Sequence, residues 1–334
     1  MSQVFPFSPF ATRYSHYKKA TPTIQHWELR DLVHCESSEE VVITEGFGIY
    51  KVDFRNQVKS PLYLLDFKPT CFSVHGGILA AGGMGGKLKV VRLEDGRIFY
   101  AGNLGTHVIN SVLVTQRGND KLLFIVSNSR LLQGFRLDED CSSELVLICR
   151  SESCTCLNYV ALSPDGRLLL TVGDSGEYFI YSVQDAFRVI SSFRICTRPA
   201  LCCAWSANSQ YFAVASQDGH CYLLETETEK LVTRLGSWQS NGFNSTCSCV
   251  KFCPNNVLDL LTFTENSNYI HLVDIRDVNG HQMEYFGDSD RDVDIAGTCF
   301  SPQGDKLFVG TSQGIYAYEI STAQRRSFGK GDFT

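Results

Sequence analysis

The second half of the chain repeats one unit, and this repeat constrains the fold more than any other feature. Each unit reads as an alternating strand, a tight turn, an apolar strand, a turn of small residues and a third strand rich in aromatic residues. The four copies are NYVALSPDGRLLLTVGDSGEYFIYSV, LCCAWSANSQYFAVASQDGHCYLLET, SCVKFCPNNVLDLLTFTENSNYIHLVDI and GTCFSPQGDKLFVGTSQGIYAYEI. Their first-turn positions, Ser163, Ser206, Cys253 and Ser301, recur after 43, 47 and 48 residues. That period is typical of a four-stranded β-propeller blade of about 40 to 45 residues.

The turns and strands of the unit have a physical reason. The SPDG and SPQG turns place Pro where φ is already restricted and Gly where φ is positive, which closes a tight hairpin. Strands such as LLLTV and KLFVG are almost wholly apolar, because neighbouring blades cover both faces of each sheet. The pattern therefore predicts hairpins packed between other hairpins.

The first half carries three weaker copies of the unit. They span Cys71–Leu93, Ser111–Leu137 and residues 29–54, the last with PLYLLDF (61–67) as its outer strand. We therefore predict an all-β fold, a seven-bladed β-propeller with four antiparallel strands per blade, as one domain over residues 26–334.

Residues 1–25 form an N-terminal arm in this interpretation. The ring must close, because an open sheet edge invites aggregation. Either the segment before the first repeat, which includes TPTIQHWEL, supplies a strand to the last blade, or residues 325–328 are that blade's own outer strand. The basic and aromatic stretch RYSHYKKA (13–20) is expected to be a solvated tail, with a partner-binding arm as the alternative.

Composition restricts the class of protein. Of 334 residues, 43% are hydrophobic and 20% charged, as in a globular domain, and the net charge of -6 argues against a broad nucleic-acid surface. No apolar run reaches the roughly 18 to 20 residues of a membrane helix, and MSQVFPFSPF lacks the basic start of a secretory signal. We expect a cytoplasmic protein, with the nucleus as the alternative, and neither a nucleic-acid nor a membrane partner.

The fourteen cysteines are scattered through apolar strand patterns, so we expect small buried hydrophobic residues in a reducing compartment. The pairs Cys154/Cys156 and Cys247/Cys249 suggest zinc on paper, but no compact second pair with His completes a site. We expect no metal and no cofactor.

Two motifs superficially suggest catalysis. Gly310–Gly314 fits the G-x-S-x-G pattern of hydrolases, but that pattern requires a strand followed by a helix, and here it occupies a turn between strands. The glycine-rich stretch 82–87 lacks the Ser or Thr and the following helix of a phosphate loop. We therefore expect no enzyme, and keep a metal-dependent or channel-site propeller enzyme as the alternative.

The repeats resemble WD40 repeats in length, turn chemistry and strand order. They lack the Trp-Asp dipeptide and the regular Gly-His pair of that family, which puts its structural hydrogen-bond tetrad in doubt. The heptapeptide His26–Leu32 (HWELRDL) resembles the start of a mainly fungal group of WD40-like propellers, one member of which is a substrate receptor of the GID-type ubiquitin ligase. This resemblance implies a protein that presents substrates to a larger assembly.

The remaining candidates for function lie in loops. Connections from one blade's outer strand to the next blade's inner strand share a face with the turns between second and third strands, and large or charged residues there are candidate interface anchors. The predicted partner-binding residues are His107, Arg130, Arg198, Trp238, Phe243 and Arg291.

We accordingly expect a non-catalytic scaffold or substrate receptor that binds a peptide or protein segment on this face, within a multi-subunit complex of the ubiquitin-ligase type. A structural subunit of a stable assembly is the other alternative. That alternative predicts exposed apolar patches on the outer strands instead.

Overall fold

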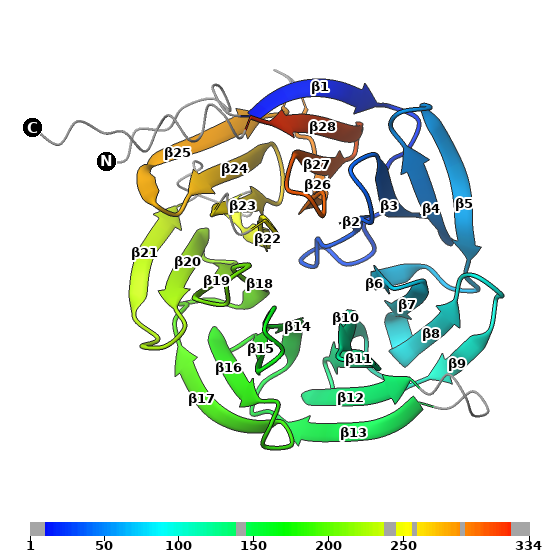
Figure 1. Ribbon diagram of the computed structural model, residues 1–334, viewed down its shortest axis with the longest axis vertical. Coiled ribbons are helices and arrows are strands. Elements are labelled where there is room, and N and C mark those ends of the chain that lie inside the picture. Colours follow the sequence, from blue (N-terminus) through cyan, green and yellow to red (C-terminus); the bar gives the residue numbers. More distant parts are fainter. Residues whose placement is uncertain (1–10, 138–144, 237–244, 256–258, 288–290, 322–334) are drawn as a thin grey trace, which may run out of the picture.

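Seven four-stranded antiparallel sheets surround a central channel in the computed structural model (Figure 1). The structure describes residues 11–137, 145–236, 245–255, 259–287 and 291–321. The all-β, seven-bladed fold with four strands per blade is thereby confirmed. Among the described residues, no helix is long and apolar enough to cross a membrane.

Six blades are continuous in sequence, and the seventh combines both ends of the chain. From the inner to the outer strand, the first blade consists of β2 (Val33–Cys35), β3 (Glu40–Glu45), β4 (Gly48–Asp53) and β5 (Val58–Leu64), and the second of β6 (Pro69–His75), β7 (Ile78–Gly83), β8 (Lys87–Arg92) and β9 (Ile98–Asn103). The third blade consists of β10 (Ile109–Arg117), β11 (Asp120–Ser127), β12 (Leu131–Leu137) and β13 (Leu145–Glu152), the fourth of β14 (Leu157–Leu162), β15 (Leu168–Gly173), β16 (Glu177–Ser182) and β17 (Arg188–Arg194), and the fifth of β18 (Ala200–Trp205), β19 (Tyr211–Ser216), β20 (His220–Glu225) and β21 (Leu231–Gly236). The sixth blade consists of β22 (Cys247–Phe252), β23 (Leu260–Glu265), β24 (Tyr269–Asp274) and β25 (Asp277–Tyr285), and the seventh of β26 (Ile295–Phe300), β27 (Lys306–Thr311), β28 (Gly314–Ile320) and β1 (Ala11–Tyr17).

The N-terminal strand β1 closes the ring by pairing with β28, from Ala11 opposite Ile320 to Tyr17 opposite Ile315. The expectation of a solvated tail over residues 13–20 is therefore wrong for 13–17, because the edge of β28 offers these residues backbone partners. Of the two expected ways of closure, the one in which the segment before the first repeat supplies a strand to the last blade is confirmed, although the strand is Ala11–Tyr17 and not TPTIQHWEL (21–29). Residues 325–328 lie outside the described residues.

The core lies between blades and not inside any one of them. Phe308 of the seventh blade packs on Phe54 of the first, with ring centroids 5.1 Å apart, and Phe124 of the third packs on Phe187 of the fourth at 5.4 Å. Second and third strands are thus covered on both faces, which explains their continuous apolar sequences.

The first blade differs most from its expected strands. Its inner strand β2 holds only three residues, because Leu29–Leu32 leave the sheet, and its outer strand β5 ends at Leu64 and not at residue 67.

Outer-to-inner connections and the turns between second and third strands share one face, as expected. The amide of Leu104, just after β9, donates to the carbonyl of Gly86 at 2.7 Å. Gly86 has a φ of +74°, and a Cβ there would lie 2.5 Å from the carbonyl oxygen of Gly105. We call this side of the disc the mouth face.

Candidate functional site

The connection between β1 and β2 crosses the mouth face and descends into the channel (Figure 1). Its first part is held on the first blade, where the amide of Thr23 donates to the carbonyl of Thr44 at 2.9 Å. At its far end the amide of Leu32 donates to the carbonyl of Ala296 at 3.0 Å. We call residues 26–32 the plug segment. The sequence singled out this same heptapeptide by its resemblance, and the structure shows where it lies.

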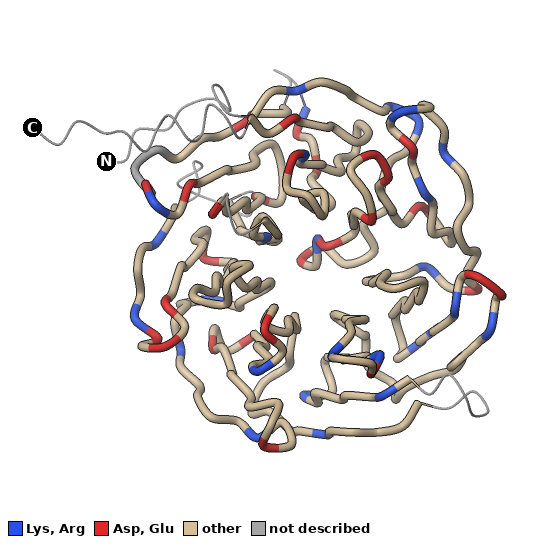
Figure 2. The backbone as a smooth tube through the Cα atoms, viewed as in Figure 1, with Lys and Arg blue, Asp and Glu red and all other residues tan. Residues whose placement is uncertain are grey.

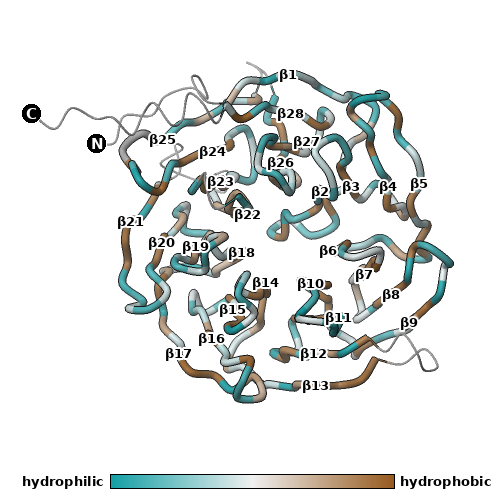
Figure 3. The backbone as a smooth tube through the Cα atoms, in the orientation of Figure 1, coloured by the Kyte–Doolittle hydropathy of each residue, from teal (hydrophilic) through white to brown (hydrophobic). Residues whose placement is uncertain are grey.

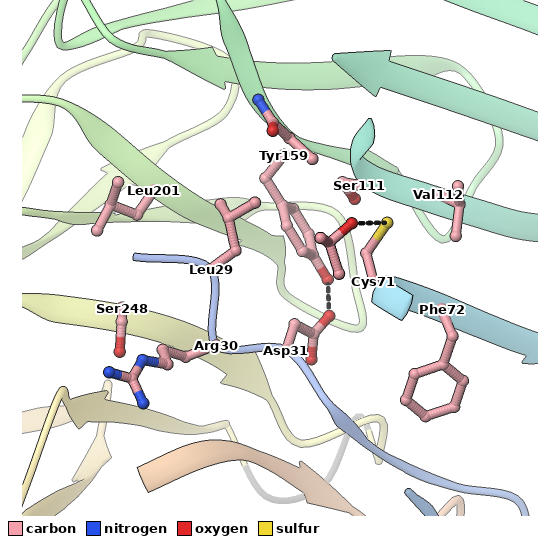
Figure 4. Close-up of a pocket in the computed structure, with 12 residues that line it drawn as sticks. Leu29, Arg30, Asp31, Cys71, Phe72, Ser111, Val112, Tyr159, Leu201 and Ser248 are labelled. Carbon is pink, nitrogen blue, oxygen red and sulfur yellow. Dashed lines mark hydrogen bonds between the residues drawn. The ribbon is translucent and has the colours of Figure 1, made fainter. Parts of the chain in front are cut away.

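Asp31 ties the plug segment to two distant blades. Its carboxylate accepts hydrogen bonds from Lys251 Nζ of β22, at 2.8 Å, and from the hydroxyl of Tyr159 of β14 (Figure 4). Lys251 Nζ also donates to the Tyr159 hydroxyl at 2.7 Å. This three-residue clasp joins the segment to the fourth and sixth blades across the channel.

The clasp is an ion pair in a poorly solvated place. The side chains of Lys251 and Asp31 are 22% and 14% exposed. Burial opposes the charged form of Asp31, but Lys251 and His34 outweigh it and hold the pKa of Asp31 below its ordinary value. Burial likewise opposes a charged Lys251, and the pKa of Lys251 is nevertheless raised well above its ordinary value by Asp31 and Tyr159. Both groups are therefore charged at neutral pH.

Arg30 is the second buried charge of the plug segment. Its side chain is only 8% exposed; Nε donates to the carbonyl of Trp27 at 3.0 Å and Nη2 lies 3.8 Å from Asp294. Among the described residues, its Nη1 atom has no hydrogen-bond partner, and neither has the nearby hydroxyl of Ser248 (Figure 4). The arginine therefore keeps unused hydrogen-bonding capacity at the axis of the ring.

Little space remains under the plug segment. Leu29, Arg30 and Asp31 close a cavity against the inner strands of the second to sixth blades, and its volume is about 10 Å³. A water molecule fits such a space, whereas an organic ligand does not. A more open space of about 290 Å³ lies between the inner strands β2, β6, β22 and β26 and is lined by His34 and Lys251. The plug segment therefore restricts access from the mouth face and not from the opposite face.

Around the mouth, equivalent positions of successive blades carry amides and carboxylates. Asn110 Nδ2 donates to Asn128 Oδ1 at 2.6 Å, and Asn158 Nδ2 donates to Asp174 Oδ1 at 2.8 Å. Gln217 Nε2 donates to Glu28 of the plug segment at 2.9 Å. Asn110 and Asn158 are buried, but the exposed carboxylate of Asp174 can accept hydrogen bonds and the half-buried amide of Gln217 can donate and accept them. The mouth therefore offers partners for a peptide backbone.

The plug segment itself contributes titratable groups to this mouth. Burial lowers the pKa of His26, while burial and then the charge of Asp174 raise the pKa of Glu28. Between these two residues, the Trp27 side chain is 51% exposed.

The four described residues predicted to bind a partner all lie on the mouth face and are exposed. His107 precedes β10, Arg130 lies in the turn between β11 and β12 with a φ of +63°, Arg198 precedes β18 and Arg291 precedes β26. No hydrogen bond or ion pair joins any two of these four. Their role in partner binding stays a prediction.

The other two predicted residues, Trp238 and Phe243, lie outside the described residues. The structure therefore gives no account of their surroundings, and their assignment stays a prediction as well.

The sequence analysis missed the clasp. Lys251 did give a signal, because it is the only charged residue of its inner strand, CSCVKF, where an unpaired charge would be costly. Nothing local indicated that Asp31 was its partner.

A second missed feature is a buried chain of polar residues in the sixth blade. His271 Nε2 lies 2.9 Å from Glu265 Oε1, and His271 Nδ1 lies 2.8 Å from His281 Nε2. Burial lowers the pKa of both histidines to about 3. All three side chains are buried, so this chain holds strands together and offers no access to a substrate. In the described part of the chain, no group of three or more His, Cys, Asp or Glu residues is placed to hold a metal ion.

Comparisons with known proteins match two short parts of the chain to family patterns. Residues 188–224 match the WD domain, G-beta repeat, and residues 248–283 match the uncharacterised protein domain DUF2415. The second match contains Lys251 and the buried Glu265–His271–His281 chain.

Two relatives are similar to this chain over very different lengths. An uncharacterized protein of Schizosaccharomyces pombe is 25% identical over 324 residues, which cover 91% of this chain and 90% of that protein. Elongator complex protein 2 of Drosophila melanogaster is 30% identical over 90 residues, which cover 25% of this chain and 11% of that protein. Neither similarity bears on the resemblance to the GID-type receptor.

Proposed function

We propose that this divergent WD40-like seven-bladed β-propeller is a non-catalytic receptor subunit that holds a peptide or protein segment at its channel mouth. One observation carries the proposal: a segment of the chain itself is fixed across the mouth by the Asp31 clasp and presents Trp27 outward. WD40 propellers generally serve as interaction scaffolds, and the fold is of that kind.

The mouth has the components of a recognition surface. A half-exposed tryptophan is the residue type most often found as an interface anchor. Amide and carboxylate groups around it, such as Gln217 and Asp174, can exchange hydrogen bonds with an extended backbone. Arg30 adds a guanidinium whose Nη1 atom has no hydrogen-bond partner in the part of the chain that the structure describes.

The surroundings of the channel favour a binding role over an enzymatic one. The cavity under the plug segment is too small for an organic substrate, the more open space of about 290 Å³ beside His34 and Lys251 is lined mainly by apolar residues, and the Glu265–His271–His281 chain is buried. The net charge of -6 favours protein over nucleic-acid partners.

Membership of a multi-subunit complex of the ubiquitin-ligase type is the finer part of the proposal. It rests on the resemblance of His26–Leu32 to the fungal receptor group. The relative named Elongator complex protein 2 supports a place in a complex of some kind, though through a short match. A cytoplasmic or nuclear location belongs to the same proposal.

The test is quantitative affinity purification of Trp27→Ala, with Met84→Ala as the matched control. Met84 is also an exposed apolar residue of the mouth face, but it lies in a turn of the second blade. If Trp27 is an anchor, its truncation costs about 2 kcal/mol of binding, or roughly 30-fold in recovered partner. Equal recovery with both variants would refute the site. Absence of ubiquitin-ligase subunits among wild-type partners would refute the finer assignment alone.

A further inference from the structure

The outer rim of the disc carries most of the exposed apolar side chains. Among the described residues, twelve of the fifteen large exposed hydrophobic side chains belong to the outer strands. Seven of them gather on three consecutive blades, along β13, β17 and β21, and Figure 3 shows hydrophobic stretches, separated by hydrophilic ones, along these three strands. We call this group the rim patch: Val146, Leu147, Val189, Ile190, Phe193, Leu231 and Val232. This is the distribution expected of the alternative raised from the sequence, a structural subunit whose outer strands are buried in a stable assembly.

The strand β17 is the centre of the rim patch. Every residue of β17 except Ser191 is exposed, and the side chains of Ile190 and Phe193 are 54% and 58% exposed. On its inner side β17 pairs with β16, whereas no strand of the described sheet pairs with its outer side. A register shift at Ile190 interrupts this edge, so its regular part runs from Ser191 to Arg194. That part presents free backbone groups together with an apolar side chain, which is the template to which a short strand can add.

Four arginines outnumber the one acidic residue, Glu152, on the three strands of the rim patch, although the chain as a whole is acidic. Arg188 and Arg194 stand at the two ends of β17, Arg150 lies on β13 and Arg234 on β21 (Figure 2). All four are exposed, and none forms an ion pair with a described residue. Cations at both ends of an open apolar edge favour an occupant that carries acidic residues.

The position of β17 is held from the neighbouring blade. The carboxylate of Glu229, in the turn before β21, accepts hydrogen bonds from the Ser191 hydroxyl at 2.6 Å and from the Tyr178 hydroxyl at 2.7 Å. The edge is thus preorganised, so an added strand does not have to order it.

We infer that the rim patch binds an extended acidic and apolar segment of a partner protein, which adds to β17 as a fifth strand of the fourth blade. Main-chain hydrogen bonds along the edge supply affinity, and alternate apolar side chains contact Ile190 and Phe193. A second copy of this chain is disfavoured as the occupant, because a symmetric contact would bring the same arginines together. The site is separate from the channel mouth and does not depend on the proposed function.

Fluorescence anisotropy with defined peptides tests the inference on the full chain. The probe is a labelled peptide of about nine residues that alternates Ile with Glu. One comparison peptide carries N-methyl groups on alternate amides, which block pairing of the backbone, and another carries Lys in place of Glu. We expect the acidic peptide to bind at least about tenfold more tightly than either comparison peptide. No binding of the acidic peptide at about 1 mM, or equal binding of the N-methylated peptide, would overturn the inference.

Charge reversal on the protein supplies the matched control. Arg188→Glu with Arg194→Glu is expected to weaken the acidic peptide about tenfold and to strengthen the lysine peptide. Arg55→Glu with Arg117→Glu changes the net charge equally at exposed positions outside the outer strands, and should change neither affinity. Equal effects of the two pairs would overturn the inference.

Sedimentation distinguishes a second copy from a partner. Self-association that Phe193→Asp abolishes would assign the rim patch to a homodimer and overturn the inference. Trp27→Ala should leave peptide binding at the rim unchanged, so failure at the mouth and failure at the rim are separate results.

Discussion

Breaking the clasp between Asp31 and Lys251 should destabilise the propeller, and its magnitude follows from the geometry. Asp31→Asn removes the carboxylate charge 2.8 Å from Lys251 Nζ and leaves a cation that is 22% exposed. Removing one partner of a buried ion pair costs about 3–5 kcal/mol. Because both side chains retain some solvent and the Tyr159 hydroxyl still accepts from Lys251, we expect about 3 kcal/mol, the lower end of this range.

The double variant separates the ion pair from the packing around it. Asp31→Asn with Lys251→Met removes both charges, so the free energy of unfolding should recover by about 2 kcal/mol relative to Asp31→Asn alone. A coupling energy of that size would show that the two groups act on each other and not through general loosening of the channel.

Thermal unfolding measures the effect, and hydrogen exchange locates it. For a chain of 334 residues, 3 kcal/mol corresponds to a decrease in Tm of about 4 °C. The amide of Leu32, which donates to Ala296, should lose protection before the amides of the blades do, since it belongs to the plug segment. A change below about 0.5 kcal/mol for Asp31→Asn, or strict additivity in the double variant, would refute the reasoning.

Three other consequences of the structure can be measured. The folded pKa of about 3 for His271 and His281 lies below the ordinary 6.5, so unfolding takes up protons as the pH falls. The stabilisation that comes from keeping these histidines neutral should be fully present above pH 6.5. On acidification the free energy of unfolding should fall by about 1.4 kcal/mol per pH unit for each histidine, and a free energy of unfolding that stays constant from pH 6.5 to 5 would contradict this. Gly297→Ala should lower the free energy of unfolding, measured with denaturant, by about 1–3 kcal/mol, because φ is +145° and the Cβ would lie 2.7 Å from the Arg30 carbonyl oxygen. An unchanged free energy of unfolding would show that the plug segment can move away from the added methyl group at no cost. Deletion of residues 1–17 removes β1 and exposes the edge of β28, so light scattering should detect aggregation, and a monomer of unchanged Tm would disprove ring closure by this strand.

The repeat predicted the blades well because the signals for hairpins are local. Turns such as SPDG and SPQG restrict φ within four residues, and apolar strands report that both faces are covered. The exceptions lie at the N-terminus. There, β1 has four basic or aromatic residues in RYSHY that do not alternate cleanly with apolar ones, and its partner β28 is near the other end of the chain.

The candidate site was predictable only in part. Loop positions such as His107 and Arg198 follow from strand order, and the structure does place them on the mouth face. The clasp was not predictable, because Asp31 and Lys251 are 220 residues apart and no local pattern pairs them.

By itself, the sequence determined the number of blades, their strand order and the face on which each loop lies, since these depend on hydrophobic alternation and on turn conformation within a few residues. Only the tertiary structure decided how the ring closes, what fills the channel and which charges meet there. Those contacts form after all seven blades have packed. Their energy depends on burial and on distances across the ring, and neither quantity is written in any single repeat.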